Sequence, residues 1–331
     1  MIRKLWQGVV LLLVILPLQV NGANEVDTAE QAQNILEKMS SASRKLNYDG
    51  IFVYNRGNQL DSMRIIHKVD EKGEVERLIS LTGTSREVVR DNQDVTCIYS
   101  DNQTVMVDKG SPNKLLPSSS QPESIARISA YYNFRILGQD RVAGRETNII
   151  EIMPKDEHRY AYRLWVDSAT SLMLKSTVVN MQEKTLETIL FTQIDIPLEI
   201  PNDLMTPMST SDYAWHTNEQ KTDLMTQEEE SQWKIQWLPN GFSIESIQAQ
   251  VLSKNQQLME HLVYSDGLAT ISLYIEKNET ETKPMNGYAA FGAVNAYTFS
   301  TDEYKVTAVG ELPAHTVHKI ASSVIQTNVN Q

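Results

Sequence analysis

Apolar and polar residues near the start of the chain follow the spacing of a helix. Between residues 28 and 46 the apolar side chains recur every three or four positions, which places them on one helix face. The segment Thr28-Ala-Glu-Gln31 fits a capping box, in which the Thr hydroxyl and the Gln side chain each satisfy a free backbone N–H group. The pattern predicts a helix that begins near Thr28 and buries Ile35, Leu36, Met39, Ala42 and Leu46.

The pattern then changes to short segments in which apolar and polar residues alternate, as they do in strands. Turn signals such as Asn55-Arg-Gly57 and Glu71-Lys-Gly73 separate them and leave no room for crossover helices, so consecutive strands pair antiparallel. A Pro/Ser-rich stretch (111–122) and a short helix (124–131) interrupt the series. The predicted strands are 50–54, 62–69, 75–81, 87–90, 95–99, 104–107, 135–139, 147–153, 160–167, 172–179 and 185–194.

Such a long antiparallel series with one long helix favours a barrel or a half-open barrel wrapped round the helix. A curled sheet with helices at its mouth encloses apolar space. The sequence therefore predicts an α+β fold whose first domain covers residues 23–196.

Composition changes after Ile196, where three prolines follow in quick succession and residues 216–232 form no apolar face. We interpret residues 197–232 as a linker between domains. A smaller α+β domain, 233–331, has predicted strands at 242–250, 261–265, 269–276 and 305–310. Its last helix is predicted to begin at Pro313 and to carry Val317, Ile320, Ala321 and Val324.

The N-terminus has the pattern of a secretory signal peptide. Arg3 and Lys4 precede an apolar segment, 9–18, that is shorter than the roughly 18 to 20 residues needed to span a bilayer. We predict that residues 1–22 are removed by cleavage before Ala23, with an uncleaved anchor as the alternative. The net charge of −12 excludes non-specific binding of nucleic acid. Cys97 is the sole cysteine, so no intramolecular disulfide forms, and we expect it to be a small buried hydrophobe.

The residue types that carry catalysis or bind cofactors are present without the spacings that these functions need. The six His residues form no His-Glu-x-x-His pair, and Gly-x-Ser-x-Gly and Gly-x-Gly-x-x-Gly motifs are absent. His315 and His318 are three residues apart on the predicted last helix, but two ligands alone favour a solvated helix face over a zinc site. We predict no enzyme activity, no cofactor and no metal.

Six ordered motifs from both predicted domains resemble the sigma-E regulatory protein family RseB/MucB. The resemblance runs from the signal peptide to the last helix. The motifs are Thr84-Ser-Arg-Glu-Val-Val-Arg90, Ser129-Ala-Tyr-Tyr-Asn-Phe134, Arg159-Tyr-Ala-Tyr-Arg-Leu-Trp-Val-Asp167, Trp237-Leu-Pro-Asn-Gly-Phe242, Tyr264-Ser-Asp-Gly-Leu268 and Val309-Gly-Glu-Leu-Pro313.

This resemblance implies a periplasmic negative regulator of the envelope-stress response. Members of the family bind the periplasmic region of the anti-sigma factor RseA (MucA) and shield it from the site-1 protease. Their large domain resembles the carriers LolA and LolB, half-open antiparallel β-barrels with helices in the opening, and it is implicated in sensing lipopolysaccharide or the acyl chains of mislocalised lipoprotein. The smaller domain contributes much of the anti-sigma contact. A periplasmic lipid or lipoprotein carrier of the LolA type is the alternative function.

Two groups of residues are candidates for these contacts. Arg64, Arg86 and Arg90 are candidates for a rim that faces lipid phosphate, because a guanidinium group binds phosphate through two parallel hydrogen bonds; ion pairing across strands is the alternative. The candidates for the anti-sigma contact are Trp237, Phe242, Tyr264, Asp266 and Gly267. For these, the alternative is that the aromatic residues belong to the core and that Asp266-Gly267 is a hairpin turn. The sequence leaves the oligomeric state open, and a homo-oligomer is among the options.

Overall fold

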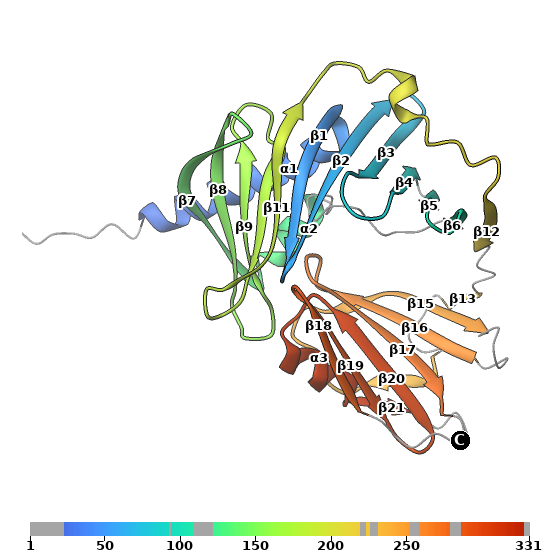
Figure 1. Cartoon of the computed structure of the whole chain (residues 1–331). Coiled ribbons are helices and arrows are strands. Elements are labelled where there is room, and N and C mark those ends of the chain that lie inside the picture. The colour runs from blue at the N-terminus through green and yellow to red at the C-terminus, as the bar shows by residue number, and fades with distance from the viewer. Residues whose placement is uncertain are drawn as a thin grey trace, which may run out of the picture.

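The structure is a computed structural model that describes residues 23–92, 94–108, 122–218, 223–225, 231–251, 258–278 and 286–327. The expected signal peptide and almost all of the Pro/Ser-rich stretch lie outside these residues. No helix in the described part of the chain combines the length and apolar character that crossing a membrane requires. The described residues form two lobes, each built on its own sheet (Figure 1).

The large lobe is a 12-stranded sheet in the order β12-β6-β5-β4-β3-β2-β1-β11-β10-β9-β8-β7. Every neighbouring pair is antiparallel except β12 and β6, which are parallel. Because β7 and β12 are both edge strands, the sheet is a curled, half-open one, as predicted. The strands are β1 (Tyr48–Arg56), β2 (Gln59–Asp70), β3 (Gly73–Ser80), β4 (Arg86–Asp91), β5 (Asp94–Tyr99), β6 (Thr104–Asp108), β7 (Tyr132–Val142), β8 (Arg145–Pro154), β9 (Ala161–Asp167), β10 (Met173–Val179), β11 (Thr185–Asp195) and β12 (Ala214–Asn218).

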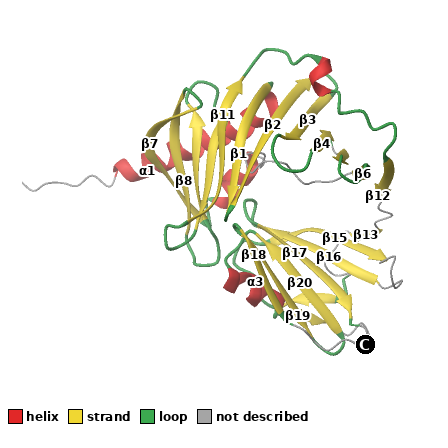
Figure 2. Cartoon of the chain, viewed as in Figure 1, coloured by secondary structure: helices red, strands yellow, loops and turns green. Residues whose placement is uncertain are grey.

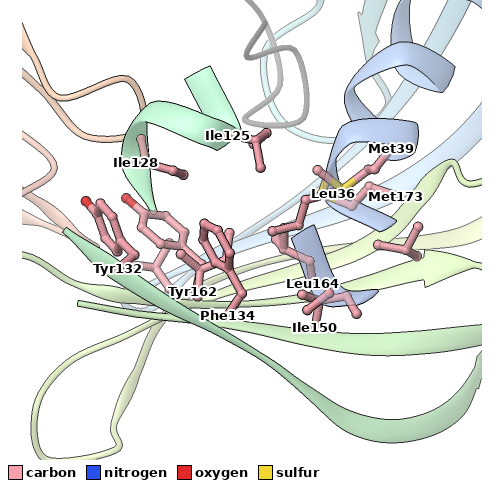
Figure 3. Close-up of a cluster of buried hydrophobic side chains, with 14 of the residues drawn as sticks. Leu36, Met39, Ile125, Ile128, Tyr132, Phe134, Ile150, Tyr162, Leu164 and Met173 are labelled. Carbon is pink, nitrogen blue, oxygen red and sulfur yellow. The ribbon is translucent and has the colours of Figure 1, made fainter. Parts of the chain in front are cut away.

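Helices α1 (Ala23–Lys45) and α2 (Pro122–Ile128) cover one face of strands β7 to β10. Figure 2 shows both helices on the same side of the sheet. Leu36 of α1 and Ile128 of α2 are fully buried against Phe134, Leu164 and neighbouring strand residues (Figure 3). The apolar interior that the sequence predicts is thus occupied by the lobe's own helix side chains. A second apolar cluster of this lobe includes Tyr48, Phe52, Ile65, Leu174 and Phe191.

The small lobe contains a seven-stranded sheet in the order β13-β15-β16-β17-β20-β19-β18 and a two-stranded sheet of β14 and β21. Helix α3 (Ala314–Ala321) packs with Val317 and Ile320 on the larger sheet, which closes a separate apolar core. The strands are β13 (Asp223–Met225), β14 (Trp233–Ile235), β15 (Ser243–Val251), β16 (Leu258–Ser265), β17 (Thr270–Lys277), β18 (Gly287–Phe291), β19 (Val294–Ser300), β20 (Tyr304–Gly310) and β21 (Val324–Gln326).

The structure corrects several details of the predicted elements. Helix α1 begins at Ala23, so Thr28 lies inside the helix and is not its N-terminal cap. Helix α3 ends at Ala321, and Val324 is buried from strand β21 instead. Cys97 is only partly buried on β5.

Part of the expected linker is ordered against the large sheet. It contains the 3-10 helix η2 (Asn202–Met205) and strand β12. Arg77 donates to the backbone carbonyl of Leu204 over 2.8 Å, and the backbone N–H of Met208 donates to Glu87 over 3.2 Å. These contacts fix residues 202–208 on the surface formed by β3 and β4.

Candidate functional site at the interface of the two lobes

The two lobes meet around Arg159, which lies between β8 and β9 and has no exposed surface. Its Nε donates to Asp266 over 2.6 Å, and its two terminal nitrogens donate to Asp156 and to the backbone carbonyl of Asn240. Asp266 and Asn240 belong to the small lobe. The buried guanidinium group therefore depends on the small lobe for two of its three acceptors, which couples its burial to the docking of the lobes.

Asp266 lies in the turn between β16 and β17 and is also fully buried. Its Oδ1 accepts the backbone N–H groups of Leu268 and Ala269, and its Oδ2 accepts Arg159 and the hydroxyl of Tyr132 over 2.9 Å. These four bonds use the full acceptor capacity of the carboxylate. Burial, reinforced by the charge of Asp266, raises the pKa of Tyr132 well above its usual value, so the hydroxyl remains a donor.

Two glycines let turns of the small lobe approach the large lobe closely. Gly241 has a φ of +92°, and a Cβ atom there would lie 2.3 Å from the ring of Tyr131. Gly267 has a φ of +101°, and a Cβ atom there would lie 2.8 Å from the guanidinium group of Arg127. Any other residue would combine a strained backbone with a steric clash.

A second contact between the lobes involves the turn between β18 and β19. Glu187 of β11 accepts the backbone N–H of Ala293 over 2.8 Å and the hydroxyl of Tyr54 over 2.6 Å. Asn295 of β19 is buried, and its side-chain amide donates to the hydroxyl of Tyr160 over 2.9 Å. Ala293 itself is fully buried and packs with the apolar cluster of the large lobe. The interface therefore contains both apolar packing and buried hydrogen bonds.

Glu311, just after β20, faces this second contact with a carboxyl group that is poorly satisfied. Its Oε1 atom is buried and has no hydrogen-bond partner among the described residues. The pKa of Glu311 is raised to about 7, mainly by burial and in part by the neighbouring charge of Glu187, while a hydrogen bond with Tyr162 opposes the rise. Near neutral pH the group is therefore divided between its charged and neutral forms.

A cleft of about 600 Å³ opens beside the Arg159 network, between the loop after β8 and helix α3. The ring of Trp237 contacts His158 edge-on, with 5.0 Å between ring centroids, and Lys319 Nζ lies 3.8 Å from the Trp237 centroid. Burial is the main cause that lowers the pKa of His158, and Asp156 opposes it. The other lining residues are Glu157, Gln236, His315, His318, Ser322 and Ser323.

The three candidate arginines do not form one rim. Strand pairing places Arg90 opposite Glu76 and His67 in one row across β4, β3 and β2, whereas Arg64 is three residues from His67 and so lies on the other face of the sheet. Arg64 pairs with Asp49 through bonds of 2.8 and 2.6 Å. Arg90 is buried 3.4 Å from Glu76, and Arg86 alone is exposed. Arg64 and Arg90 therefore form ion pairs across strands, with Asp49 and Glu76, as the alternative interpretation of these arginines held.

The five candidates for the anti-sigma contact do come together, but mostly in contacts within the chain. Tyr264 and Asp266 are buried, Gly267 packs against Arg127, and the ring of Phe242 lies 5.1 Å from the guanidinium carbon of Arg159. Trp237 differs because it lines the cleft. Asp266-Gly267 is a hairpin turn, as the alternative interpretation held, and it also serves as a contact between the lobes.

Sequence reasoning missed the large-lobe residues Tyr132, Arg159 and Glu187 of this interface, and it also missed Glu311 of the small lobe. A signal was nevertheless present. Tyr132, Arg159 and Glu311 each lie within one of the six motifs, and so do the turns at Gly241 and Gly267. The sequence alone does not show that these motifs meet in space, because Arg159 and Asp266 are 107 residues apart in the chain and only the fold brings them together.

Comparison with known proteins gives matches over both lobes. The model of the MucB/RseB N-terminal domain matches residues 31–209, and that of the MucB/RseB C-terminal domain matches residues 227–325. The sigma-E factor regulatory protein RseB of Haemophilus influenzae is 28% identical over 91% of this chain and 94% of its own length. The sigma factor AlgU regulatory protein MucB of Pseudomonas aeruginosa is 29% identical over 89% and 91%.

Solved structures agree with these matches. The crystal structure of MucB in complex with MucA(peri) has a TM-score of 0.71 and 25% identity, and it covers 90% of this chain and 100% of that one. The complex structure of Pseudomonas aeruginosa MucA/MucB has a TM-score of 0.73 at the same identity and coverage.

Proposed function

The chain belongs to the MucB/RseB family of regulatory proteins, and on this basis we propose that it is a negative regulator of a sigma-E envelope-stress response. It binds the periplasmic region of an anti-sigma factor of the RseA/MucA type and protects that region from site-1 proteolysis. It acts in the periplasm after export by a cleaved signal peptide. Lipopolysaccharide or the acyl chains of mislocalised lipoprotein release it from the anti-sigma factor.

The observation that carries the proposal is the match of both lobes, over about nine tenths of the chain, to a protein solved in complex with MucA. A match to the large lobe alone would suit a lipid carrier equally well. The small lobe and its interface with the large lobe favour a regulator, since a carrier needs only the curled sheet.

We place the anti-sigma contact at the cleft that Trp237 lines, because the other candidate residues are engaged within the chain. A partly buried indole beside an open cleft is the kind of anchor that peptide segments use. Tyr264 and Asp266 would reach a partner only if the lobes separated. Their role in the proposal is to hold the two walls of the cleft in position.

Release by lipid requires a change in the large lobe, because side chains of α1 and α2 occupy its apolar interior. Each buried methylene contributes roughly 0.8 kcal/mol, so an acyl chain that displaces a helix recovers much of the apolar contact that the helix loses. If lipid binds the arrangement with a displaced helix and the anti-sigma segment binds the packed one, each weakens the other by the same factor.

Protease protection tests the proposal directly. The periplasmic region of the anti-sigma factor is incubated with its site-1 protease, with and without the full chain, and intact substrate is measured over time. We expect protection at equimolar chain, and loss of protection when lipopolysaccharide micelles are added. Unchanged cleavage would refute the regulator, and transfer of lipid to an acceptor with no retention of the anti-sigma fragment would identify a LolA-type carrier.

Two variants, Trp237→Ala and Trp233→Phe, distinguish a role of the cleft from a role of the small-lobe core. Trp233 is buried in the small-lobe core, so its conservative replacement controls for general effects on that lobe. We expect Trp237→Ala to reduce retention of the anti-sigma fragment in a pull-down about tenfold or more, as for an anchor residue, and Trp233→Phe to leave it close to normal. If the two variants retain the anti-sigma fragment equally well, the contact lies outside the cleft.

A further inference from the structure

Three potential metal ligands from the two lobes converge at the mouth of the cleft. Glu157 and His158 come from the loop after β8, and His315 comes from the first turn of α3. One ligand atom from each residue lies within 4.8 Å of the other two. The two imidazole rings are tilted against each other with 5.7 Å between their centroids.

The geometry needs only a small contraction to hold a tetrahedral metal ion. Zinc bonds of about 2.0–2.1 Å to nitrogen and oxygen place neighbouring ligand atoms roughly 3.3 Å apart. Glu157 and His315 are exposed side chains that can rotate to close the remaining distance. The open mouth of the cleft leaves a fourth position for water.

The ligand atoms are also chemically available. In the described part of the chain, the imidazole ring of His158 has one hydrogen-bond contact, from Nδ1 to the hydroxyl of Thr316 at 3.5 Å. Its Nε2 is therefore free to coordinate, while Thr316 orients the ring as a second-shell partner does in metal sites. The side chain of Thr316 is fixed because it is fully buried in α3.

A second group of similar composition shows what an unsuitable cluster looks like. His67 lies near Glu74 and Glu76, but it is buried, with Nδ1 2.7 Å from the carbonyl of Leu46 and Nε2 3.0 Å from the carboxylate of Glu74. Both ring nitrogens are already within hydrogen-bond distance of an oxygen atom, so a metal ion would have to displace one of these contacts. The cluster at the cleft does not have this restriction.

We propose that Glu157, His158 and His315 form a binding site for a divalent transition metal ion, of which zinc is the best fit, that bridges the two lobes. Two imidazoles and one carboxylate are the ligand set that zinc takes in sites with an open fourth position. Lys319 is the main opposing charge nearby, and its ammonium group is held over the ring of Trp237. That charge weakens the site, so we expect micromolar affinity.

The site would add a metal-dependent link to the contacts that dock the lobes. His158 directly precedes Arg159, and His315 lies on the helix that forms the other wall of the cleft. A bound ion would therefore stabilise the arrangement of the walls that Arg159 and Asp266 already define.

The test is isothermal titration of the full chain, freed of metal by chelation, with zinc chloride at pH 7. We expect one ion per chain with a Kd of about 1–100 µM and a higher unfolding temperature with zinc. Glu157→Gln and His315→Ala change exposed positions and do not threaten folding. Each should weaken binding at least about tenfold, because loss of a second-shell partner alone has an effect of that size. His158→Gln should do the same if the variant folds.

His318→Ala is the matched control, since His318 lies on the same helix and lines the same cleft but packs edge-on against Tyr297, outside the ligand group. It should bind zinc within about twofold of the unaltered chain. Absence of binding below 1 mM zinc would refute the site, and so would equal affinity in Glu157→Gln, His315→Ala and His318→Ala. Weak binding of several ions per chain would indicate adventitious surface binding and would count against it as well.

Discussion

Arg159 and Asp266, 107 residues apart in the chain, form an ion pair across the two lobes in which neither side chain is exposed to solvent. A charge in such a place is stable only while its partner is present. The Asp266 carboxylate also accepts hydrogen bonds from Tyr132 and from the backbone N–H groups of Leu268 and Ala269. The ion pair is therefore the centre of a polar network in which the carboxylate is fully hydrogen-bonded. It links the fold of one lobe to the position of the other.

We expect Asp266→Ala to destabilise the protein by about 3–5 kcal/mol, because it leaves the Arg159 guanidinium group buried without its main partner. Urea unfolding, followed by circular dichroism, measures the change. Lys305→Ala is the control, since it removes an exposed ion pair with Glu276 and should cost less than about 1 kcal/mol. Equal effects of the two changes would mean that the lobes are not docked through Arg159 in solution.

Gly241→Ala should separate the lobes without removing any polar group. The added methyl group would lie 2.3 Å from Tyr131, and the φ of +92° adds backbone strain. Gly83→Ala provides the backbone strain alone, because Gly83 has a φ of +70° with nothing within 4 Å. We expect Gly83→Ala to cost about 1 kcal/mol and Gly241→Ala clearly more, with faster proteolysis between the lobes. A similar cost for both variants would show that Tyr131 moves aside freely.

The interface should become less stable as the pH rises through neutrality. The pKa of Glu311 is raised from 4.5 to about 7, so between these values the folded protein holds a proton that the unfolded chain releases. Stability therefore falls with increasing pH from about 4.5, and the loss is complete above about 7. Because solvent reaches part of this side chain, we expect a loss of about 1–2 kcal/mol.

Glu311→Gln tests this assignment, because it keeps the shape of the side chain and removes its charge. The variant should be more stable than the unaltered chain at pH 8.5 and about equally stable at pH 4, where the carboxyl group is protonated in both the folded and the unfolded chain, as measured by urea unfolding at both pH values. Glu303→Gln changes an exposed carboxylate near β20 and should leave the pH profile unchanged. A profile of Glu311→Gln that parallels the unaltered chain would assign the titration to another group.

Arg86 is the one candidate rim residue that the structure leaves exposed, so it provides the direct test of phosphate recognition. We expect Arg86→Gln to weaken binding to lipopolysaccharide micelles about fivefold, corresponding to about 1 kcal/mol for an exposed charged contact, without loss of stability. Arg64→Gln, on the other face of the sheet, should leave micelle binding unchanged. If the two variants bind micelles equally well, lipid phosphate does not contact the Arg86 face.

Most strands of the large lobe were predictable because they have an alternating pattern and are bounded by short turns, whereas β12 lies in the segment that was expected to be a linker. The same argument explains several of the elements that were missed, but not β12 and β19, which have five and seven residues. Strand β18 is exposed throughout, so burial imposes no alternation on it, and β13, β14 and β21 have three residues each, too few to show a period. Helix α1 starts before its apparent capping box, and intrinsic propensity does not explain this start, because Asn24, Val26 and Asp27 are weak helix formers.

The interface was less predictable than the strands, since it depends on register and tertiary contact. Arg64, Arg86 and Arg90 were grouped by residue type, whereas the strand pairing puts Arg64 on the opposite face. Asp266-Gly267 was identified as a turn from local sequence, but only the fold brings it to Arg159. Residue chemistry therefore indicated which groups matter, and the sheet topology decided what they contact.

The pairing of β1 with β11 gives the large lobe a seam between its earliest and latest antiparallel strands. Strands β1 to β6 and β7 to β11 can each form as a meander of local hairpins, but the two halves join only after about 140 residues of chain have been looped together. Assembly of the curled sheet must therefore wait for β11, so a chain that emerges N-terminus first stays open until that strand arrives. Delayed closure of this kind gives chaperones and proteases time to act on the unfinished sheet.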